Sequence, residues 1–169
     1  MNIGDTITGA LFSGPEQTYR LALWRLWDSS KPALLFVGLN PSTANGTKDD
    51  PTIRRLAGYA KAWGYGGLFA GNLFSYVTPD PGELFVKGGV ELPGGPNDEA
   101  LRQMRGLSGL ALLGWGHLGA NAGKRPEAVI ALLGEPVYCL TVTRNGEPGH
   151  PLYLRRDLKP RPYEREVKP

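Results

Sequence analysis

The segment from Leu34 to Ala44 constrains the fold more than any other part of the sequence. It begins with an apolar run, Leu34 to Val37, of the kind found in strands that are buried on both faces of a sheet. The run leads into Gly38-Leu39-Asn40-Pro41-Ser42, a turn built from residues that break strands. Ligands of open α/β sheets bind beyond the carboxyl ends of such strands. We therefore expect Asn40, which offers one acceptor and two amide donors, to lie at a binding site; the alternative is a simple turn before a helix.

Further apolar runs extend this strand into a sheet. They alternate along the chain with segments that open on helix caps or proline, a pattern typical of a parallel sheet with helices on both faces. The expected strands are residues 34–39, 68–73, 110–114 and 137–142, and the expected helices begin near Pro51, Asn97 and Arg125. We predict an α/β fold, a three-layer α/β/α sandwich with a central, mostly parallel four-stranded sheet.

Two regions fit this pattern less well. Residues 6–13 and 19–27 are apolar-rich and flank Gly14-Pro15, so they form either a hairpin or a strand followed by a short helix. Residues 78–95 are rich in proline and glycine, and we expect a long loop there with little regular structure.

The composition suits one domain, which we place at residues 1–155, followed by a charged, proline-rich and extended tail at residues 156–169. The net charge of +3 permits a polyanionic partner without requiring one. With Cys139 as the single cysteine, no internal disulfide can form, and no Cys/His spacing predicts a zinc site. No signal peptide and no apolar run of membrane-spanning length is recognisable. We expect a cytoplasmic monomer without metal or cofactor.

Polar side chains follow the ends of several expected strands. Asn40 follows the first strand, Asn72 lies near the end of the second, and Trp115 and His117 follow the third. His150 lies in a loop after the fourth. Because the carboxyl ends of parallel strands share one edge of a sheet, we expect these side chains to converge. Amides that distinguish donors from acceptors, combined with aromatic faces, suit a flat heterocycle such as a nucleobase.

Gly38 to Ser42, Asn72 and His150-Pro151 together resemble motifs of the uracil-DNA glycosylase superfamily. Residues 20–155 are also similar to a bacterial and phage family of unknown function. The motifs that carry this second resemblance are Gly38-Leu39-Asn40-Pro41-Ser42-Thr43-Ala44, Asp50-Pro51-Thr52-Ile53-Arg54-Arg55, Trp63-Gly64-Tyr65-Gly66-Gly67, Asn72-Leu73-Phe74, Trp115-Gly116 and His150-Pro151-Leu152-Tyr153-Leu154.

The glycosylase resemblance implies the three-layer α/β/α fold of that superfamily and a role for each of three residues. Asn40 would position the attacking water, Asn72 would read the edge of the base, and His150 would close on the flipped nucleotide and its phosphate. We name Asn40, His150 and Asp50 as the catalytic residues. The expected substrate-binding residues are Gly38, Leu39, Pro41, Ser42, Asn72, Trp115, Tyr65, Arg54 and Arg55. The expected partner is DNA or another nucleobase-containing ligand.

The sequence also departs from the glycosylase pattern. Leu152 stands where the superfamily usually has a phosphate-binding Ser, so single-stranded DNA, free nucleotides and modified bases stay open as substrates. Cleavage of an N-glycosidic bond is the first hypothesis, and a binding module or a base-modifying transferase are the alternatives. Residues 145–151 hold two glycines and two prolines, and we expect a mobile loop that exposes His150. Arg54 and Arg55 are expected to bind phosphate at a helix N-terminus, or else to form a solvated helix face.

Overall fold

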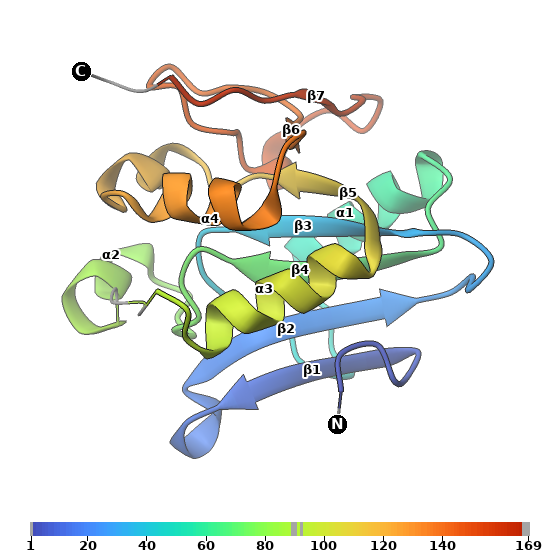
Figure 1. Ribbon diagram of the computed structural model, residues 1–169, viewed down its shortest axis with the longest axis horizontal. Coiled ribbons are helices and arrows are strands. Elements are labelled where there is room, and N and C mark those ends of the chain that lie inside the picture. The colour runs from blue at the N-terminus through green and yellow to red at the C-terminus, as the bar shows by residue number, and fades with distance from the viewer. Residues whose placement is uncertain (1, 89–90, 92, 167–169) are drawn as a thin grey trace.

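The computed structural model describes residues 2–88, 91 and 93–166 (Figure 1). Within these residues one sheet of seven strands crosses the molecule in the order β1-β2-β4-β3-β5-β6-β7. The strands are β1 (Thr8–Ser13), β2 (Tyr19–Leu26), β3 (Ala33–Gly38), β4 (Gly67–Asn72), β5 (Ser108–Leu113), β6 (Tyr138–Cys139) and β7 (Arg161–Pro162). Strands β4, β3, β5 and β6 are parallel neighbours. Strands β1, β2 and β7 run antiparallel to the strands they pair with, so the sheet is mixed.

The sheet is therefore larger than the four-stranded, mostly parallel sheet that the sequence predicts. The ambiguous N-terminal segments form the hairpin β1–β2, and β2 joins the sheet beside β4. The reason is that β2 is apolar on both faces: Trp24 packs into the core on one side of the sheet and Leu23 into the core on the other. The predicted strand at residues 137–142 is also too long, because only Tyr138 and Cys139 pair as a strand.

Helices cover both faces of this sheet. Helix α1 (Pro51–Ala62) lies behind the sheet in Figure 1, and α3 (Pro96–Gly106) and α4 (Arg125–Leu133) cross its near face. Helix α1 begins where Asp50 accepts a hydrogen bond from the backbone N–H of Ile53 at 2.9 Å, and Pro51 occupies the first turn. Its apolar side, with Ile53 and Leu56, packs on the sheet. The three layers predicted from the sequence are present, with a larger middle layer.

The segment 78–95 is more regular than the predicted loop. Asp80 caps the short helix α2 (Pro81–Glu83), because its side chain accepts from the backbone N–H of Gly82 at 2.8 Å. The chain then continues as the π-helical turn η2 (Leu84–Gly88). Residues 89, 90 and 92 of the predicted loop lie outside the described residues. The other short helical turns of the described chain are η1 (Pro15–Gln17), η3 (His117–Asn121) and η4 (Pro151–Tyr153).

The C-terminal segment contacts the domain at several points of its described length. Strand β7 pairs with β6 at the sheet edge, opposite the edge that carries β1. Tyr163 is buried, and Trp63 donates to the carbonyl of Leu158 at 3.1 Å. No helix among the described residues combines the length and apolar character that crossing a bilayer requires.

Strand register brings two of the predicted site residues together. In the parallel pair β3 and β4, Phe36 lies opposite Ala70 and Gly38 opposite Asn72. Asn40 follows β3 by two residues, so Asn40 and Asn72 meet at the carboxyl edge of the parallel strands. This is the edge at which the sequence predicts a binding site.

Candidate functional site

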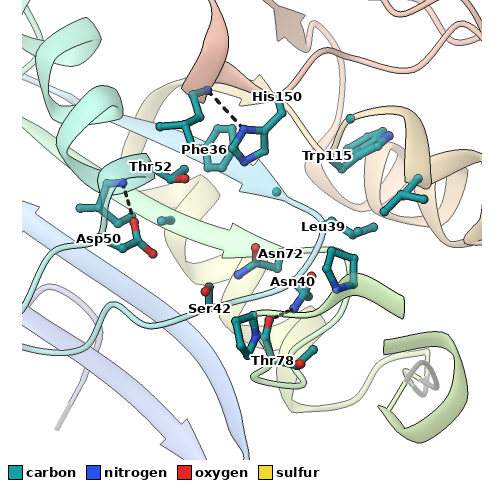
Figure 2. Close-up of a pocket in the computed structure, with 18 of the residues that line it drawn as sticks. Phe36, Leu39, Asn40, Ser42, Asp50, Thr52, Asn72, Thr78, Trp115 and His150 are labelled. Atoms are coloured by element: carbon teal, nitrogen blue, oxygen red, sulfur yellow. Dashed lines mark hydrogen bonds between the residues drawn. The ribbon is translucent and has the colours of Figure 1, made fainter. Parts of the chain in front are cut away.

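A pocket of about 420 Å³ opens at the carboxyl edge of β3, β4 and β5. This volume falls within the range of small-molecule sites. Figure 2 shows the polar side chains around it, which come from the turn after β3, the end of β4, the start of α1 and the loop before η4. The polar side chains of this lining belong to Arg20, Asn40, Ser42, Asp50, Thr52, Asn72, Thr78, Trp115, His117, His150 and Tyr153.

Asn72 presents an unpartnered amide to this pocket. The residue is only 5% exposed, and its side chain makes no hydrogen bond to any described residue. Its backbone is fixed from behind, because Asn97 donates to the Asn72 carbonyl at 3.1 Å. Helix α4 adds a second anchor, since Arg125 donates to the carbonyl of Leu73 at 2.7 Å and forms a buried ion pair with Asp98. The amide is therefore held in place with both its donor and its acceptor available to a ligand.

The side chain of Asn40, by contrast, is held in place by hydrogen bonds that its own amide donates. Its Nδ2 donates to the backbone carbonyl of Thr78 at 2.8 Å and to that of Pro41 at 3.0 Å, as Figure 2 shows for the first of these bonds. Within the described chain, Oδ1 of Asn40 accepts no hydrogen bond, so the side chain offers the pocket an acceptor of fixed orientation. Thr78 is buried, and its carbonyl depends on this donor.

Phe36 supplies an apolar surface beside these amides. It is 4% exposed and lines the pocket on the α1 side of the sheet. Two glycines make room for its ring: a Cβ at Gly38 would lie 3.0 Å from the ring, and a Cβ at Gly114 only 2.6 Å from it. A flat ligand in the pocket would therefore meet an aromatic face next to the amide of Asn72.

His150 is neutral in this setting. Its Nδ1 accepts a hydrogen bond from the backbone N–H of Leu152 at 3.2 Å, which leaves the ring proton on Nε2. Burial lowers the pKa of His150 below its ordinary value of 6.5, and the nearby charge of Asp50 opposes this shift only in part. His150 thus contributes an uncharged N–H donor to the pocket.

The loop that carries His150 is anchored, which corrects the prediction of a mobile, exposed loop. Its backbone pairs with the segment that precedes it and with the turn after β5: Gly149 donates to the carbonyl of Thr141, and Gly116 to that of Pro148, each at 2.8 Å. Glu147 is 3% exposed and accepts from Nε1 of Trp115 at 2.7 Å and from Arg165 of the C-terminal segment. The buried carboxylate of Glu147, which accepts hydrogen bonds from two donors, therefore anchors this loop in the way that buried apolar side chains anchor other loops.

Asp50 and Arg20 give the pocket its charges. Asp50 is the one carboxylate among the described lining residues, and one of its oxygens caps α1. Arg20 is 4% exposed and donates to the carbonyl of Ala44 at 2.8 Å, while its Nε has no partner in the described structure. Burial lowers the pKa of Arg20 to about 10, although the charge of Asp50 acts in the opposite direction. At neutral pH, the guanidinium is therefore a buried cation next to the Asp50 carboxylate.

Most predicted site residues meet in this pocket, and some do not. Its lining includes the predicted residues Gly38, Leu39, Asn40, Ser42, Asp50, Asn72, Trp115 and His150. Pro41 contributes only its carbonyl, as an acceptor for Asn40. Arg54 and Arg55 line a second pocket on α1. Tyr65 lies near Pro32 and Gly109, at the opposite edge of the sheet, because it precedes β4 rather than following it.

Among the lining residues that the sequence does not single out, Phe36 and Arg20 contribute most to the character of the pocket. Phe36 is one of several consecutive apolar residues in β3, so the sequence pattern predicts only that it lies in the hydrophobic core. Arg20 lies near the start of the apolar segment that becomes β2. A positively charged residue within such a segment is the one sequence signal that could have indicated a functional role for it. The function of neither residue follows from the sequence alone, because the elements that complete the pocket are far away along the chain.

Comparison with known proteins assigns a family without assigning a function. A family model described as "Protein of unknown function (DUF1643)" matches residues 20–152, the part of the chain that includes β3 to β6, all of β2 but its first residue, and every residue of the first pocket except Tyr153. Neither the curated proteins nor the solved structures yield a match. The described residues contain no cluster of His, Cys, Asp and Glu suited to a metal ion.

Proposed function

Because this chain belongs to the DUF1643 family of proteins of unknown function, we propose its activity from the pocket itself: hydrolysis of the N-glycosidic bond of a damaged or modified nucleobase. The observation that carries this proposal is the amide of Asn72, buried, unpartnered and fixed at the pocket edge. Neither polar atom of this amide is among the described side-chain atoms that are both sealed from solvent and unpartnered, so water can occupy its donor and acceptor until a ligand with a complementary pair replaces the water. The edge of a pyrimidine offers such a pair, and Phe36 offers a surface on which the ring can stack.

His150 suits the leaving base. When the bond between the sugar carbon and the base nitrogen breaks, the base departs with the electron pair and carries negative charge. A neutral imidazole that donates through Nε2 stabilises such an anion without transferring its proton. The hydrogen bond from the N–H of Leu152 to Nδ1 holds the ring in the tautomer that this role needs.

Asn40 and Asp50 suit the attacking water. The free Oδ1 of Asn40 accepts a hydrogen bond from the water and so orients its lone pair toward the sugar carbon. As the new carbon–oxygen bond forms, the water loses a proton, and Asp50 is the carboxylate in the lining that can take it. Its negative charge also stabilises the positive charge that develops on the sugar ring.

An excision assay tests the proposal. Oligonucleotides that carry uracil or modified pyrimidines, single-stranded and double-stranded, are incubated with the protein, and abasic sites are detected by alkaline cleavage. We expect abasic product from at least one substrate and its loss in Asn40→Ala, whereas Asn121→Ala, at an exposed asparagine outside the lining, keeps wild-type activity.

Two other outcomes would replace the proposal. Binding of a base-containing oligonucleotide without any abasic product would favour a binding module. A change in the mass of the base that leaves the glycosidic bond intact and needs a co-substrate would favour a base-modifying transferase.

A further inference from the structure

A second pocket, of about 520 Å³, lies on the outer face of α1. Three arginines line it, Arg54 and Arg55 from the helix and Arg156 from the segment after η4. We propose that this arginine pocket holds the phosphodiester backbone of a nucleic-acid strand whose target nucleotide enters the first pocket. The inference rests on the proposed function, and it selects a polymeric strand over a free nucleotide as the substrate.

The charge of the arginine pocket is unbalanced. None of its described lining residues is acidic. Three acidic residues lie close to it along the chain and have other partners: Asp50 accepts from the N–H of Ile53 at 2.9 Å, Asp157 pairs with Arg155 at 2.5 Å and Asp49 pairs with Arg25 at 2.9 Å. Arg156 forms no hydrogen bond or ion pair with any described residue and is exposed. Guanidinium groups without carboxylate partners are suited to phosphate, which they contact through paired N–H donors.

Gly58 keeps the floor of this pocket open. It occupies the middle of α1, where glycine is less favourable than alanine. No packing contact explains its presence, because a Cβ built there would meet no atom within 4 Å. Glycine at this position lowers the stability of the helix, and no clash with a neighbouring residue requires it. What it does provide is space between the arginines for a ligand.

The two pockets adjoin at Leu152. Leu152 lines both of them, and the first turns of α1 contribute Asp50 and Thr52 to one pocket and Pro51 and Arg54 to the other. The backbone also links them, since Arg55 donates to the Leu152 carbonyl at 3.0 Å and the N–H of Leu152 donates to His150. A strand with one nucleotide inserted beside His150 would therefore run onto the arginine pocket.

Salt-dependent strand binding tests this inference without relying on catalysis. The probe is a fluorescent thymidine single strand of about twelve nucleotides, long enough to cover one binding site of ordinary size. Its dissociation constant is measured by anisotropy between about 50 and 200 mM salt, where each phosphate contact contributes about 0.7 to the slope of log affinity against log salt. We expect Arg156→Gln to reduce that slope by about 0.7, and the double variant Arg54→Ala/Arg156→Gln by about twice as much.

Two matched controls distinguish an effect of this pocket from a general change in net charge and from a change in the stability of the helix. Lys159→Gln removes one exposed positive charge three residues beyond Arg156 and outside the lining, and it should leave the slope unchanged. Gly58→Glu should weaken strand binding, whereas Gly58→Ala, which changes the helix similarly without adding charge, should weaken it much less.

Equal slopes in Arg156→Gln and Lys159→Gln would overturn the inference. So would tight binding of inorganic phosphate or thymidine monophosphate that depends on Arg156 as strongly as strand binding does. The proposed function fails separately: a strand that binds through the arginines and never yields an abasic site leaves this inference standing. Conversely, excision that none of the arginine variants affects would leave the proposed function standing and refute the strand path.

Discussion

The ends of β3 and β4 carry the same residue type in two different states. Asn40 has committed both amide hydrogens to backbone carbonyls and keeps only an acceptor. Asn72, on the neighbouring strand, has committed neither its donor nor its acceptor to the described protein. The difference teaches that the side chain of Asn40 contributes to the fold as well as to the pocket, whereas that of Asn72 makes no contribution to the hydrogen bonding of the described fold and is left to water or a ligand.

Removing the Asn40 side chain should have the largest effect, because it affects both roles. Asn40→Ala leaves the buried carbonyl of Thr78 without its donor, so we expect the free energy of unfolding to fall by about 1–3 kcal/mol. Excision should be lost as well. Chemical denaturation and the excision assay measure the two effects on one variant, with Asn121→Ala, at an exposed asparagine outside the lining, as the control. A variant of unchanged stability would show that the described hydrogen bond contributes nothing.

Asn72→Ala should separate binding from stability. No hydrogen bond within the described chain is lost, so the free energy of unfolding should change by less than about 1 kcal/mol. Two hydrogen bonds to the ligand are lost, each worth about 0.5–1.5 kcal/mol, so the affinity for a base-containing oligonucleotide should fall by about fivefold or more. Titration and thermal melting measure the two quantities. A large fall in melting temperature with affinity intact would contradict the comparison and place Asn72 in the scaffold.

A smaller effect, and a pH-dependent one, is expected at His150. Its pKa in the folded protein is lower than in the unfolded chain because burial disfavours the charged ring. The contribution of the neutral ring to stability is complete above pH 6.5, and it is lost as the pH falls from 6.5 toward the folded pKa, since the unfolded chain binds the proton first.

Ligand affinity should decline at a lower pH than stability, because affinity depends on the folded protein alone. Protonation of Nδ1 breaks the hydrogen bond from Leu152, so affinity should be constant above the folded pKa of His150, which lies below 6.5, and decline as the pH falls through it. His150→Gln should flatten this decline, whereas His117→Gln, at the other histidine of the lining, should keep it. Affinity that still declines in His150→Gln would assign the titration to another group.

The smallest effect is expected at Tyr65. The sequence places it among the substrate-binding residues, but it lies at the amino edge of the parallel strands. Its hydroxyl makes no hydrogen bond to a described residue, so Tyr65→Phe should change stability by less than about 0.5 kcal/mol and leave affinity unchanged. Loss of affinity in this variant, measured by the same titration, would mean that the ligand reaches the far edge of the sheet.

The sequence predicts the parallel centre of the fold and the convergence of Asn40, Asn72 and His150, because both depend on local pattern. Long apolar runs identify buried strands, and the geometry of parallel sheets places their carboxyl ends together. Arg20 and the carboxylate of Glu147 depend instead on contacts between distant segments. Nothing local to Arg20 indicates that Asp50 will lie nearby, and nothing local to Glu147 indicates Arg165.

The ion pair between Arg165 and Glu147 also sets an order of events in the cell. Translation delivers the chain from its amino end, and domains begin to fold as they emerge. Arg165 leaves the ribosome after every strand of the described sheet, and until it does, Glu147 lacks the cation that accompanies its burial next to Trp115. Asn40 and Asn72 can occupy their places on the nascent sheet earlier. The wall of the pocket that contains Trp115 and supports His150 is therefore completed only after the chain has been made as far as Arg165.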